Sequence, residues 1–217
     1  MALVGLLGGT FDPVHNGHLQ LAEAVLARCG LDRILFIPAA APPHKINASI
    51  CPIKCRLEMV RLAVESLPRC TVSELEASPD RISYTIETLR TLRSSQAREA
   101  TYFFIIGGDA FLEIETWHRW PELLASTSFI VALRQGYPLQ DLHALLDHHH
   151  FYKDSENQEE RYHGQHGTSV LLLSAPIDEI SSTDIRRRIA HHQAWRHLVP
   201  QRVATYIDEH RLYLRSS

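Results

Sequence analysis

Short, continuous apolar runs alternate along this chain with longer segments whose apolar residues recur at helical spacing. The runs predict strands that are covered on both faces, and they occupy residues 3–7, 34–38, 102–106, 129–133 and 170–173. The periodic segments predict helices over residues 18–29, 53–66, 84–95, 121–125, 139–148, 183–191 and 200–209. This alternation predicts an α/β fold with a mostly parallel sheet and a ligand crevice outside the carboxyl ends of its strands.

The composition narrows the class of protein. A chain of 217 residues is long enough for one sizeable core, and we expect residues 1–217 to form a single domain. Its 22 basic and 25 acidic residues argue against a nucleic-acid surface or an electrostatic membrane anchor. No apolar run has the length of a membrane helix and the first residues lack a basic signal region, so we expect a cytoplasmic protein. The spacing of the cysteines indicates reduced thiols rather than a metal site or disulfide framework, at Cys29, Cys51, Cys55 and Cys70.

The loop after the first predicted strand has the sequence GGTFDPVHNGH, at residues 8–18. Gly8 and Gly9 permit close backbone approach, and His18 falls in the first turn of the following helix, where unpaired N–H groups and the helix dipole favour an anion. His15 lies just outside that turn. Imidazole donates to phosphate oxygens and titrates near physiological pH, so the pair predicts a phosphate site. For the isolated HxGH motif, a plain bend with solvated histidines is an equally good interpretation.

A second basic segment, PPHK, follows the predicted strand at residues 34–38. Its two prolines stiffen the loop, which could hold Lys45 over the strand ends as a charged lid against phosphate. A solvated lysine in an ordinary proline-rich connection is the alternative, and for this motif alone it is the favoured one.

A third segment, ISSTDIR, opens the predicted helix at residues 183–191. Ser182 and Thr183 can offer hydroxyls and helix-start N–H groups to a phosphate, and Arg186 could reach the same anion one turn later. The alternative is a capped helix with basic residues on a solvated face. We favour that alternative for Arg187 and Arg188.

Three other positions could contact a second ligand. Thr85 lies in SYTIETL, which by itself is a well-capped helix start. Asp109 follows two glycines at the carboxyl end of a predicted strand, where it could hold a ribose hydroxyl or cap the next helix. Trp117 and Trp120 are spaced as core residues usually are.

Taken in order, these motifs closely resemble the nucleotidyltransferase superfamily that carries HxGH on a Rossmann-like sheet. GGTFDPVHNGH, PPHK, SYTIETL, Trp117 and ISSTDIR are most similar to the bacterial nicotinate-nucleotide adenylyltransferases. The resemblance spans nearly the whole chain. It implies a Rossmann-like three-layer α/β/α fold in which the helices from about residue 183 complete the ATP site.

The resemblance implies adenylyl transfer from ATP to nicotinate mononucleotide, which gives nicotinic acid adenine dinucleotide (deamido-NAD) and pyrophosphate in NAD biosynthesis. It implies catalytic roles for His15, His18, Lys45 and Arg186. It implies an ATP site formed by Gly8, Gly9, Thr10, Phe11, His15, His18, Ser182, Thr183 and Arg186. It implies a mononucleotide site formed by Lys45, Thr85, Asp109 and Trp117. Trp117 would stack on the nicotinate ring and leave Trp120 for the core, while His118 departs from the tyrosine common at that position.

The residue types predict the mechanism. No serine or cysteine is placed with a base, so we expect direct in-line attack without a covalent intermediate. Mg²⁺ is expected to enter with ATP and to be held mostly by substrate oxygens and water, since Asp12 and Asp109 do not make a dedicated metal site.

Two other functions compete with this prediction. Another HxGH nucleotidyltransferase, such as a pantetheine-phosphate adenylyltransferase or a cytidylyl-transferring enzyme, would share His18 but would give no reason for SYTIETL and Trp117. A non-catalytic nucleotide-binding module is disfavoured because the charged residues of the motifs are all present.

The histidine-rich segment at residues 148–167 predicts a surface loop. A metal site there is disfavoured because consecutive histidines point in different directions. Its candidate ligands would be His148, His149, His150, His163 and His166.

Overall fold

A single eight-stranded sheet organises the protein. The computed structural model describes residues 1–41, 50–78, 82–95, 100–154 and 160–214, and in these ranges the strand order is β3-β2-β1-β4-β5-β8-β7-β6. The strands are β1 (Ala2–Gly9), β2 (Arg33–Pro38), β3 (Cys70–Val72), β4 (Ala100–Gly107), β5 (Ser128–Leu133), β6 (Tyr152–Lys153), β7 (Glu160–His163) and β8 (Ser169–Ser174). Pairing is parallel from β3 to β8, and β7 is antiparallel to both of its neighbours. The strand order reverses between β1 and β4, where an open α/β sheet binds its ligand.

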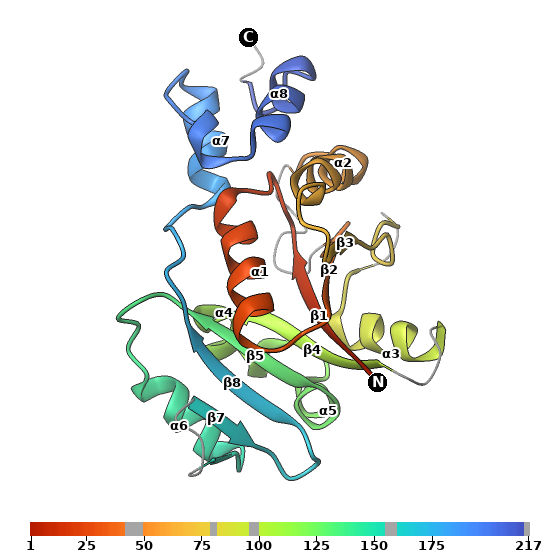
Figure 1. Cartoon of the computed structure of the whole chain (residues 1–217), viewed down its shortest axis with the longest axis vertical. Coiled ribbons are helices and arrows are strands. Elements are labelled where there is room, and N and C mark those ends of the chain that lie inside the picture. The colour runs from red at the N-terminus through yellow and green to blue at the C-terminus, as the bar shows by residue number, and fades with distance from the viewer. Residues whose placement is uncertain (42–49, 79–81, 96–99, 155–159, 215–217) are drawn as a thin grey trace.

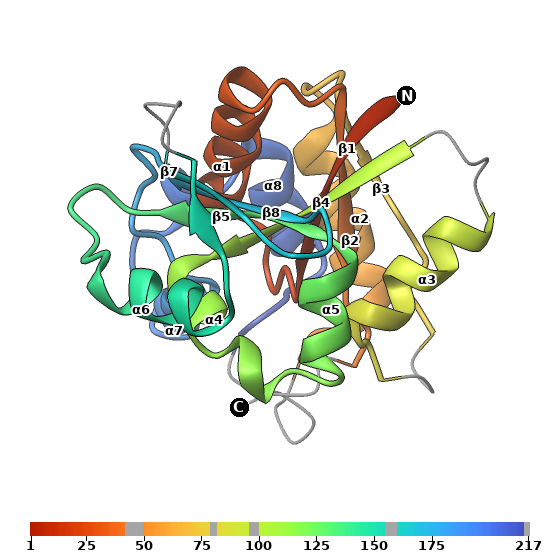
Figure 2. The same cartoon turned by 90° about the horizontal axis from the view of Figure 1, so that it is seen from below.

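Helices cover both faces of this sheet and form the outer layers (Figures 1 and 2). One layer holds α1 (Asn16–Arg28) and α2 (Ile53–Val64). The same core includes residues of α7 (Ser182–Ala190), the 3₁₀ turn η3 (Arg196–Leu198) and α8 (Gln201–Glu209), which stand beyond the strands at the top of Figure 1. The other holds α3 (Thr85–Ser95), α4 (Gly108–Leu112), the 3₁₀ turn η2 (Ile114–Thr116), α5 (Trp120–Ser126) and α6 (Gln140–His148). Each face of the sheet has its own hydrophobic core: the first core lies on the side of α1 and α2, and the second on the side of α3 to α6. Successive strand residues point to opposite faces, so Leu7 packs in the first core and Leu6 in the second.

The predicted α/β fold with its mostly parallel sheet is confirmed, and each predicted strand and helix is present with shifted ends. The sequence pattern missed β3 and α4, which have only three and five residues. In the described residues, none of the helices has both the length and the apolarity needed to cross a membrane. Cys29, Cys51, Cys55 and Cys70 form no disulfide in the structure.

The predicted surface loop at residues 148–167 is wrong in part, because β6 and β7 extend the sheet from this segment. Tyr162 of β7 is buried against the second core, and Gly164 lies so close to the Phe151 ring that a Cβ atom there would approach it to 2.7 Å. The backbone N–H and C=O groups of β7 find partners in β8. The segment is polar and has no continuous apolar run, so the sequence pattern did not predict a strand there.

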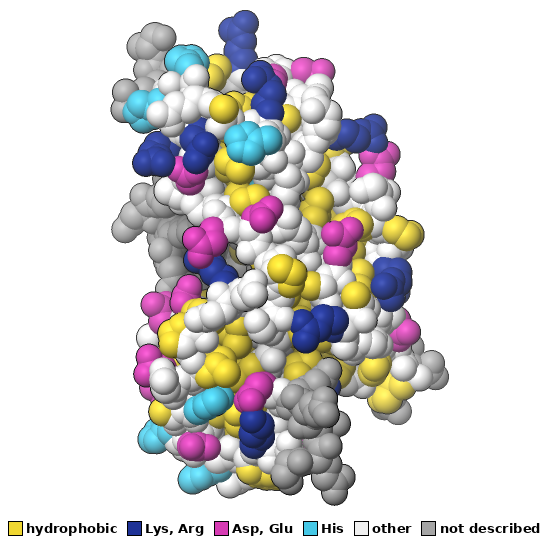
Figure 3. All heavy atoms as spheres, turned by 60° about the vertical axis from the view of Figure 1, so that its left-hand side comes forward, with side chains coloured by type: hydrophobic (Ala, Val, Ile, Leu, Met, Phe, Trp, Pro, Cys, Tyr) yellow, Lys and Arg dark blue, Asp and Glu magenta, His cyan; other side chains and the backbone are white. Residues whose placement is uncertain are grey.

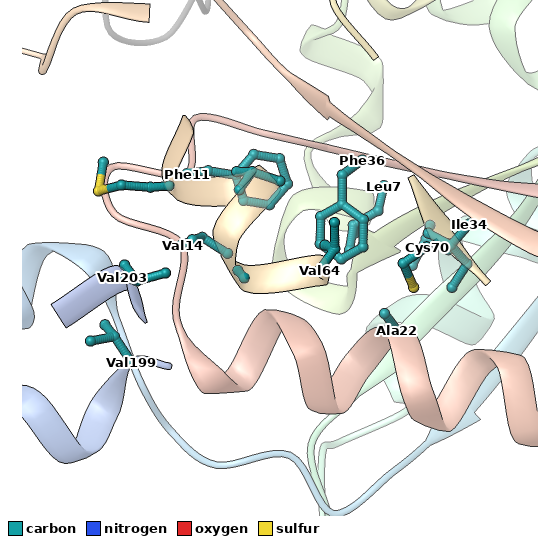
Figure 4. Close-up of a cluster of buried hydrophobic side chains, with 14 of the residues drawn as sticks. Leu7, Phe11, Val14, Ala22, Ile34, Phe36, Val64, Cys70, Val199 and Val203 are labelled. Atoms are coloured by element: carbon teal, nitrogen blue, oxygen red, sulfur yellow. The ribbon is translucent and has the colours of Figure 1, made fainter. Parts of the chain in front are cut away.

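Two apolar side chains anchor the loop between β1 and α1 in the hydrophobic core. Phe11 and Val14 are buried, and Figure 4 shows them among the core side chains that include Phe36 of β2 and Val203 of α8. The rings of Phe11 and Phe36 lie 5.7 Å apart. Phe11 has a left-handed backbone conformation (φ 48°), and the Asp12–Pro13 peptide is cis. The loop is therefore held in one shape by the core beneath it.

Candidate active site

The two histidines of the opening loop meet at the start of α1. His15 is the residue before the helix, and its backbone N–H donates to Nδ1 of His18 at 3.2 Å. The two imidazoles stack with their centroids 3.7 Å apart, and the edge of Phe11 contacts His18 at 4.9 Å. Because Nδ1 of His18 accepts this hydrogen bond, the proton of the neutral ring is on Nε2. His18 thus presents an N–H donor from Nε2.

Burial controls the charge of this pair. It lowers the pKa of His15 to about 4 and, together with the neighbouring His15, lowers the pKa of His18 well below its ordinary value. The expectation that the pair titrates near physiological pH is therefore wrong for the unliganded protein, in which both rings are neutral at pH 7. Nδ1 of His15 is buried and has no hydrogen-bond partner among the described residues. An unpaired buried nitrogen at a helix start is what an incoming anion would stabilise.

The start of α7 is docked on the same loop (Figure 1). Ser182 Oγ donates to the carbonyl of Pro13 at 2.9 Å, and Arg186 Nη1 donates to the carbonyl of Asp12 at 2.7 Å. Arg186 Nη2 also donates to Thr183 Oγ1 at 3.3 Å. The structure therefore brings together the first and third predicted phosphate-binding segments, which are separated by about 170 positions in the chain.

The remaining basic residues of α7 have other partners. Arg187 and Arg188 both pair with Asp184 on the surface of the helix. Their assignment to a solvated face is confirmed. The cap of this helix is Ser181, whose hydroxyl accepts from the backbone N–H of Asp184 at 3.1 Å.

Asp12 supports the loop from inside. It is buried, and its Oδ1 accepts hydrogen bonds from the Tyr213 hydroxyl at 2.8 Å and from the Cys51 N–H at 3.3 Å. Its Oδ2 lies 3.7 Å from Arg186 Nη1. Burial raises the pKa of Tyr213, so its hydroxyl retains the proton that it donates to Asp12. A carboxylate with these protein partners is a structural group and does not fit a metal ligand.

Arg56 on α2 is a supporting residue that the sequence analysis missed. Its guanidinium is almost fully buried and donates to four carbonyls, those of Thr10, Ala39, Ala40 and Cys51, at 2.7 to 3.2 Å. It thereby ties the opening loop to the segments on either side of residues 42–49. Its signal in the sequence is weak: Arg56 shares the buried helical face of Val60 and Ala63, an unusual place for an arginine.

Two of the predicted mononucleotide residues, Thr85 and Trp117, lie in segments that contact each other. A Cβ atom at Gly8 would lie 3.3 Å from the Phe104 ring, and the rings of Phe104 and the half-buried Trp117 lie edge to face with their centroids 5.9 Å apart. Thr85 is the first residue of α3. The ring of Tyr84 stacks on His118 at 4.2 Å, which joins the start of α3 to the Trp117 segment.

The structure says less about the other residues that the sequence analysis singled out. Asp109 lies in the first turn of α4, and its carboxylate accepts from the Tyr137 hydroxyl at 2.9 Å. Trp120 packs against the second core but is only half-buried, with its ring 4.9 Å from that of His149. Lys45 and His44 lie outside the described residues.

The strand order, the histidine pair and the docking of Arg186 on the same loop fit a nucleotidyltransferase, and comparison with known proteins shows this class. The model of the Cytidylyltransferase-like family matches residues 6–188. Over 215 residues the chain is 40% identical to the "Probable nicotinate-nucleotide adenylyltransferase" of Desulfotalea psychrophila, covering 98% of this chain and all of that protein. The protein of the same name from Symbiobacterium thermophilum is 41% identical, covering 99% and 97%. The chain belongs to the family of the nicotinate-nucleotide adenylyltransferases within this superfamily.

Solved structures share the fold at lower identity. The Plasmodium falciparum nicotinic acid mononucleotide adenylyltransferase complexed with NaAD superposes with a TM-score of 0.76 at 16% identity, over 98% of each chain. The putative nicotinate-nucleotide adenylyltransferase from Vibrio parahaemolyticus gives a TM-score of 0.65 at 16% identity, over 100% of this chain and 98% of that one. The Rossmann-like three-layer fold implied by the sequence is thus confirmed.

Proposed function

We propose that this protein transfers the adenylyl group of ATP to nicotinate mononucleotide, which gives deamido-NAD and pyrophosphate. The observation that carries the proposal is the loop before α1, in which His15 and His18 stack on each other and Arg186 donates to the carbonyl of Asp12. Relatives named for this activity, about 40% identical over nearly the whole chain, support it.

The ATP phosphates would lie against the first turn of α1. The Nε2–H of His18 and the free N–H groups of that turn would donate to phosphate oxygens, and Arg186 would add a permanent positive charge. Gly8, Gly9, Thr10, Phe11, Ser182 and Thr183 would shape the same site. Since Ser182 and Thr183 hold the loop and Arg186 in place, part of their contribution would be positional.

Nicotinate mononucleotide would lie toward α3 and Trp117. The pyridine ring would stack on the exposed face of Trp117, whose edge is fixed by Phe104, while the N–H groups at the start of α3, beside Thr85, would receive the carboxylate. Asp109 would contact the ribose. Lys45, from the segment that follows β2, would close over the phosphates.

The reaction would be an in-line displacement. The phosphate of the mononucleotide attacks the α-phosphorus of ATP, the bond to the β-phosphate oxygen breaks, and pyrophosphate leaves with that electron pair. The nucleophile is already an anion, so the protein contributes positioning and charge stabilisation rather than a strong base. Neutral His15 and His18 can donate to phosphate without first losing or gaining a proton.

Magnesium would enter with ATP, where it would neutralise part of the phosphate charge. Asp12 has protein partners and Asp109 pairs with Tyr137, so the described residues of this site do not form a magnesium cage. A metal held by phosphate oxygens and water fits this donor set. We also expect the enzyme to work in the cytoplasm, with its ATP and mononucleotide substrates.

The test compares three acceptors with ATP: nicotinate mononucleotide, nicotinamide mononucleotide and pantetheine phosphate. We expect pyrophosphate release with nicotinate mononucleotide and a lower kcat/KM with the other two. His18→Ala should lower kcat by about 100-fold or more, because it removes a donor to developing charge. Trp117→Ala should chiefly raise KM for the mononucleotide, by about tenfold, through loss of stacking. His166→Gln, which changes an exposed histidine, is the matched control.

Two results would contradict the proposal. Turnover of pantetheine phosphate without turnover of nicotinate mononucleotide would indicate another nucleotidyltransferase. Normal ATP binding without product from any acceptor would indicate a non-catalytic nucleotide-binding module. Circular dichroism of each variant separates a lost reaction from a lost fold.

A further inference from the structure

Histidines gather at the end of the molecule opposite α7 and α8. Figure 3 shows one group of histidine side chains at the lower end of the face that it draws, and another group at the upper end. The proposed reaction uses none of them. Three side chains there, Glu115 of η2, His148 at the end of α6 and His149 after it, have one ligand atom each within 4.8 Å of the others, and we call them the Glu115 cluster.

The end of α6 explains how two consecutive histidines come together. The N–H of Phe151 donates to the carbonyl of Leu146 at 2.9 Å, the N–H of His150 donates to that of Asp147 at 3.0 Å, and His150 is left-handed (φ 58°). This is a Schellman ending, in which the chain reverses directly after the helix. The rings of His148 and His149 then lie 4.9 Å apart, edge to face. The expectation that they point in different directions is wrong at this position.

His149 is held as a preorganised ligand would be. Its ring packs against Trp120 at 4.9 Å, and its side chain is only 12% exposed. Its Nε2 lies 2.9 Å from Glu115 Oε1, yet makes no hydrogen bond to any described residue. A buried ring nitrogen close to a carboxylate oxygen, without a hydrogen bond between them, is suited to a cation that both atoms can bind.

Neighbouring histidines are engaged elsewhere. His143 lies 3.4 Å from Glu160 and, like His149, makes no hydrogen bond through Nε2, but no third ligand atom among the described residues gathers with this pair. His163 lies 3.3 Å from Asp154. His150 adopts the left-handed conformation that ends the helix, and His166 is exposed. Among the described residues of this region, the Glu115 cluster is therefore the candidate for a specific metal site.

We propose that Glu115, His148 and His149 bind one divalent transition-metal ion of the Zn²⁺ class. Two imidazole nitrogens and a carboxylate oxygen are common zinc ligands, and water would complete a tetrahedral set. With bonds of about 2.0–2.2 Å, ligand atoms around zinc stand roughly 3–4 Å apart, so the cluster needs only small side-chain rotations. Both Glu115 and His148 are exposed enough to make those rotations.

The ion would link two elements of the second layer. Glu115 stands two residues before Trp117, whose backbone N–H donates to Ile114 at 2.9 Å within the same short turn. Binding would fasten η2 to the end of α6. This structural role does not depend on the proposed reaction, and it is measured by metal affinity and thermal stability.

The experiment titrates Zn²⁺ into untagged, metal-free full-length protein by calorimetry, with Mg²⁺ in excess, and repeats the titration with Co²⁺ while recording its visible absorption. Glu115→Gln and His148→Gln change exposed side chains, so both variants should fold. The control is His150→Gln, which changes the adjacent histidine outside the cluster.

We expect one ion per chain, a tetrahedral Co²⁺ spectrum and a raised melting temperature with Zn²⁺. Each cluster variant should bind Zn²⁺ at least about tenfold more weakly, since changes in the surroundings of a metal alone cost that much, while His150→Gln binds as wild type does. Unchanged affinity in Glu115→Gln or His148→Gln would overturn the proposal. So would an equal loss in His150→Gln, which would indicate unspecific binding by the histidine run, or the absence of one-to-one binding.

Discussion

Acidification should destabilise this protein through His15, whose ring is neutral and buried in the folded state. Burial lowers the pKa of His15 from 6.5 to about 4. Between these values the unfolded chain binds a proton that the folded protein does not, so the stability linked to the neutral ring is complete above pH 6.5 and is lost as pH falls. At about 1.4 kcal/mol per pH unit, the loss reaches about 3 kcal/mol near pH 4.

The variant His15→Asn isolates this effect. Asparagine does not titrate and is a favourable residue before a helix, so the variant should keep the start of α1 folded. The free energy of unfolding is measured by urea denaturation of both proteins from pH 7.5 to pH 4.5, without ATP. By pH 4.5 the wild type should have lost about 2 to 3 kcal/mol more than the variant. His166→Gln, at an exposed position, should follow the wild type.

Parallel curves for wild type and His15→Asn would refute this reasoning. They would mean that the folded protein protonates His15 as readily as the unfolded chain does. An independent check is the NMR titration of the His15 ring, whose midpoint should lie well below the ordinary histidine value of 6.5.

Three further outcomes follow from the supporting contacts. Arg56→Met should cost about 3–5 kcal/mol in urea denaturation, because it leaves four carbonyls without their buried charged donor; a loss below about 1 kcal/mol would contradict this. Ser181→Ala should cost about 1 kcal/mol by loss of the α7 cap and should raise KM for ATP, whereas an unchanged KM would separate α7 from the ATP site. Tyr137→Phe should change KM for the mononucleotide by a few-fold with the melting temperature nearly constant, since it releases Asp109; steady-state kinetics with unchanged KM would exclude a role for Asp109 there.

The fold was predictable where its strands are buried. Parallel strands covered on both faces consist of continuous apolar residues, so β1, β2, β4, β5 and β8 were found from the pattern alone. The two antiparallel strands β6 and β7 were missed for the opposite reason. Tyr152 of β6 is exposed and β7 is largely polar, because these strands are fixed by pairing with a neighbour rather than by burial on both faces.

The residues of the candidate site also form two groups: some are predicted by local sequence patterns, and others are explained only by the fold. His15 and His18 follow from local rules on glycines and helix starts, and Arg186 from the position of a basic residue one turn into a helix. Local rules could not identify Arg56 and Tyr213. Arg56 contacts Thr10, 46 positions away, and Tyr213 contacts Asp12, 201 positions away. The chemistry of such a contact depends on the fold, and no local pattern encodes it.

The charged side chains at the loop between β1 and α1 come from both groups of residues. A buried carboxylate at Asp12 would repel ATP if it were unopposed. Arg186 lies 3.7 Å from it, and the negative charge of Asp12 in turn favours the charged form of the buried Arg56. Since both loop histidines are neutral, two guanidiniums face one carboxylate, and the described part of the site carries about one net positive charge. That charge is small beside an ATP polyphosphate, so the proposed function calls for further positive charge, for which Mg²⁺ and Lys45 are our candidates. If they supply it, a Lys45→Ala variant should bind ATP with a steeper dependence on Mg²⁺ than the wild type does.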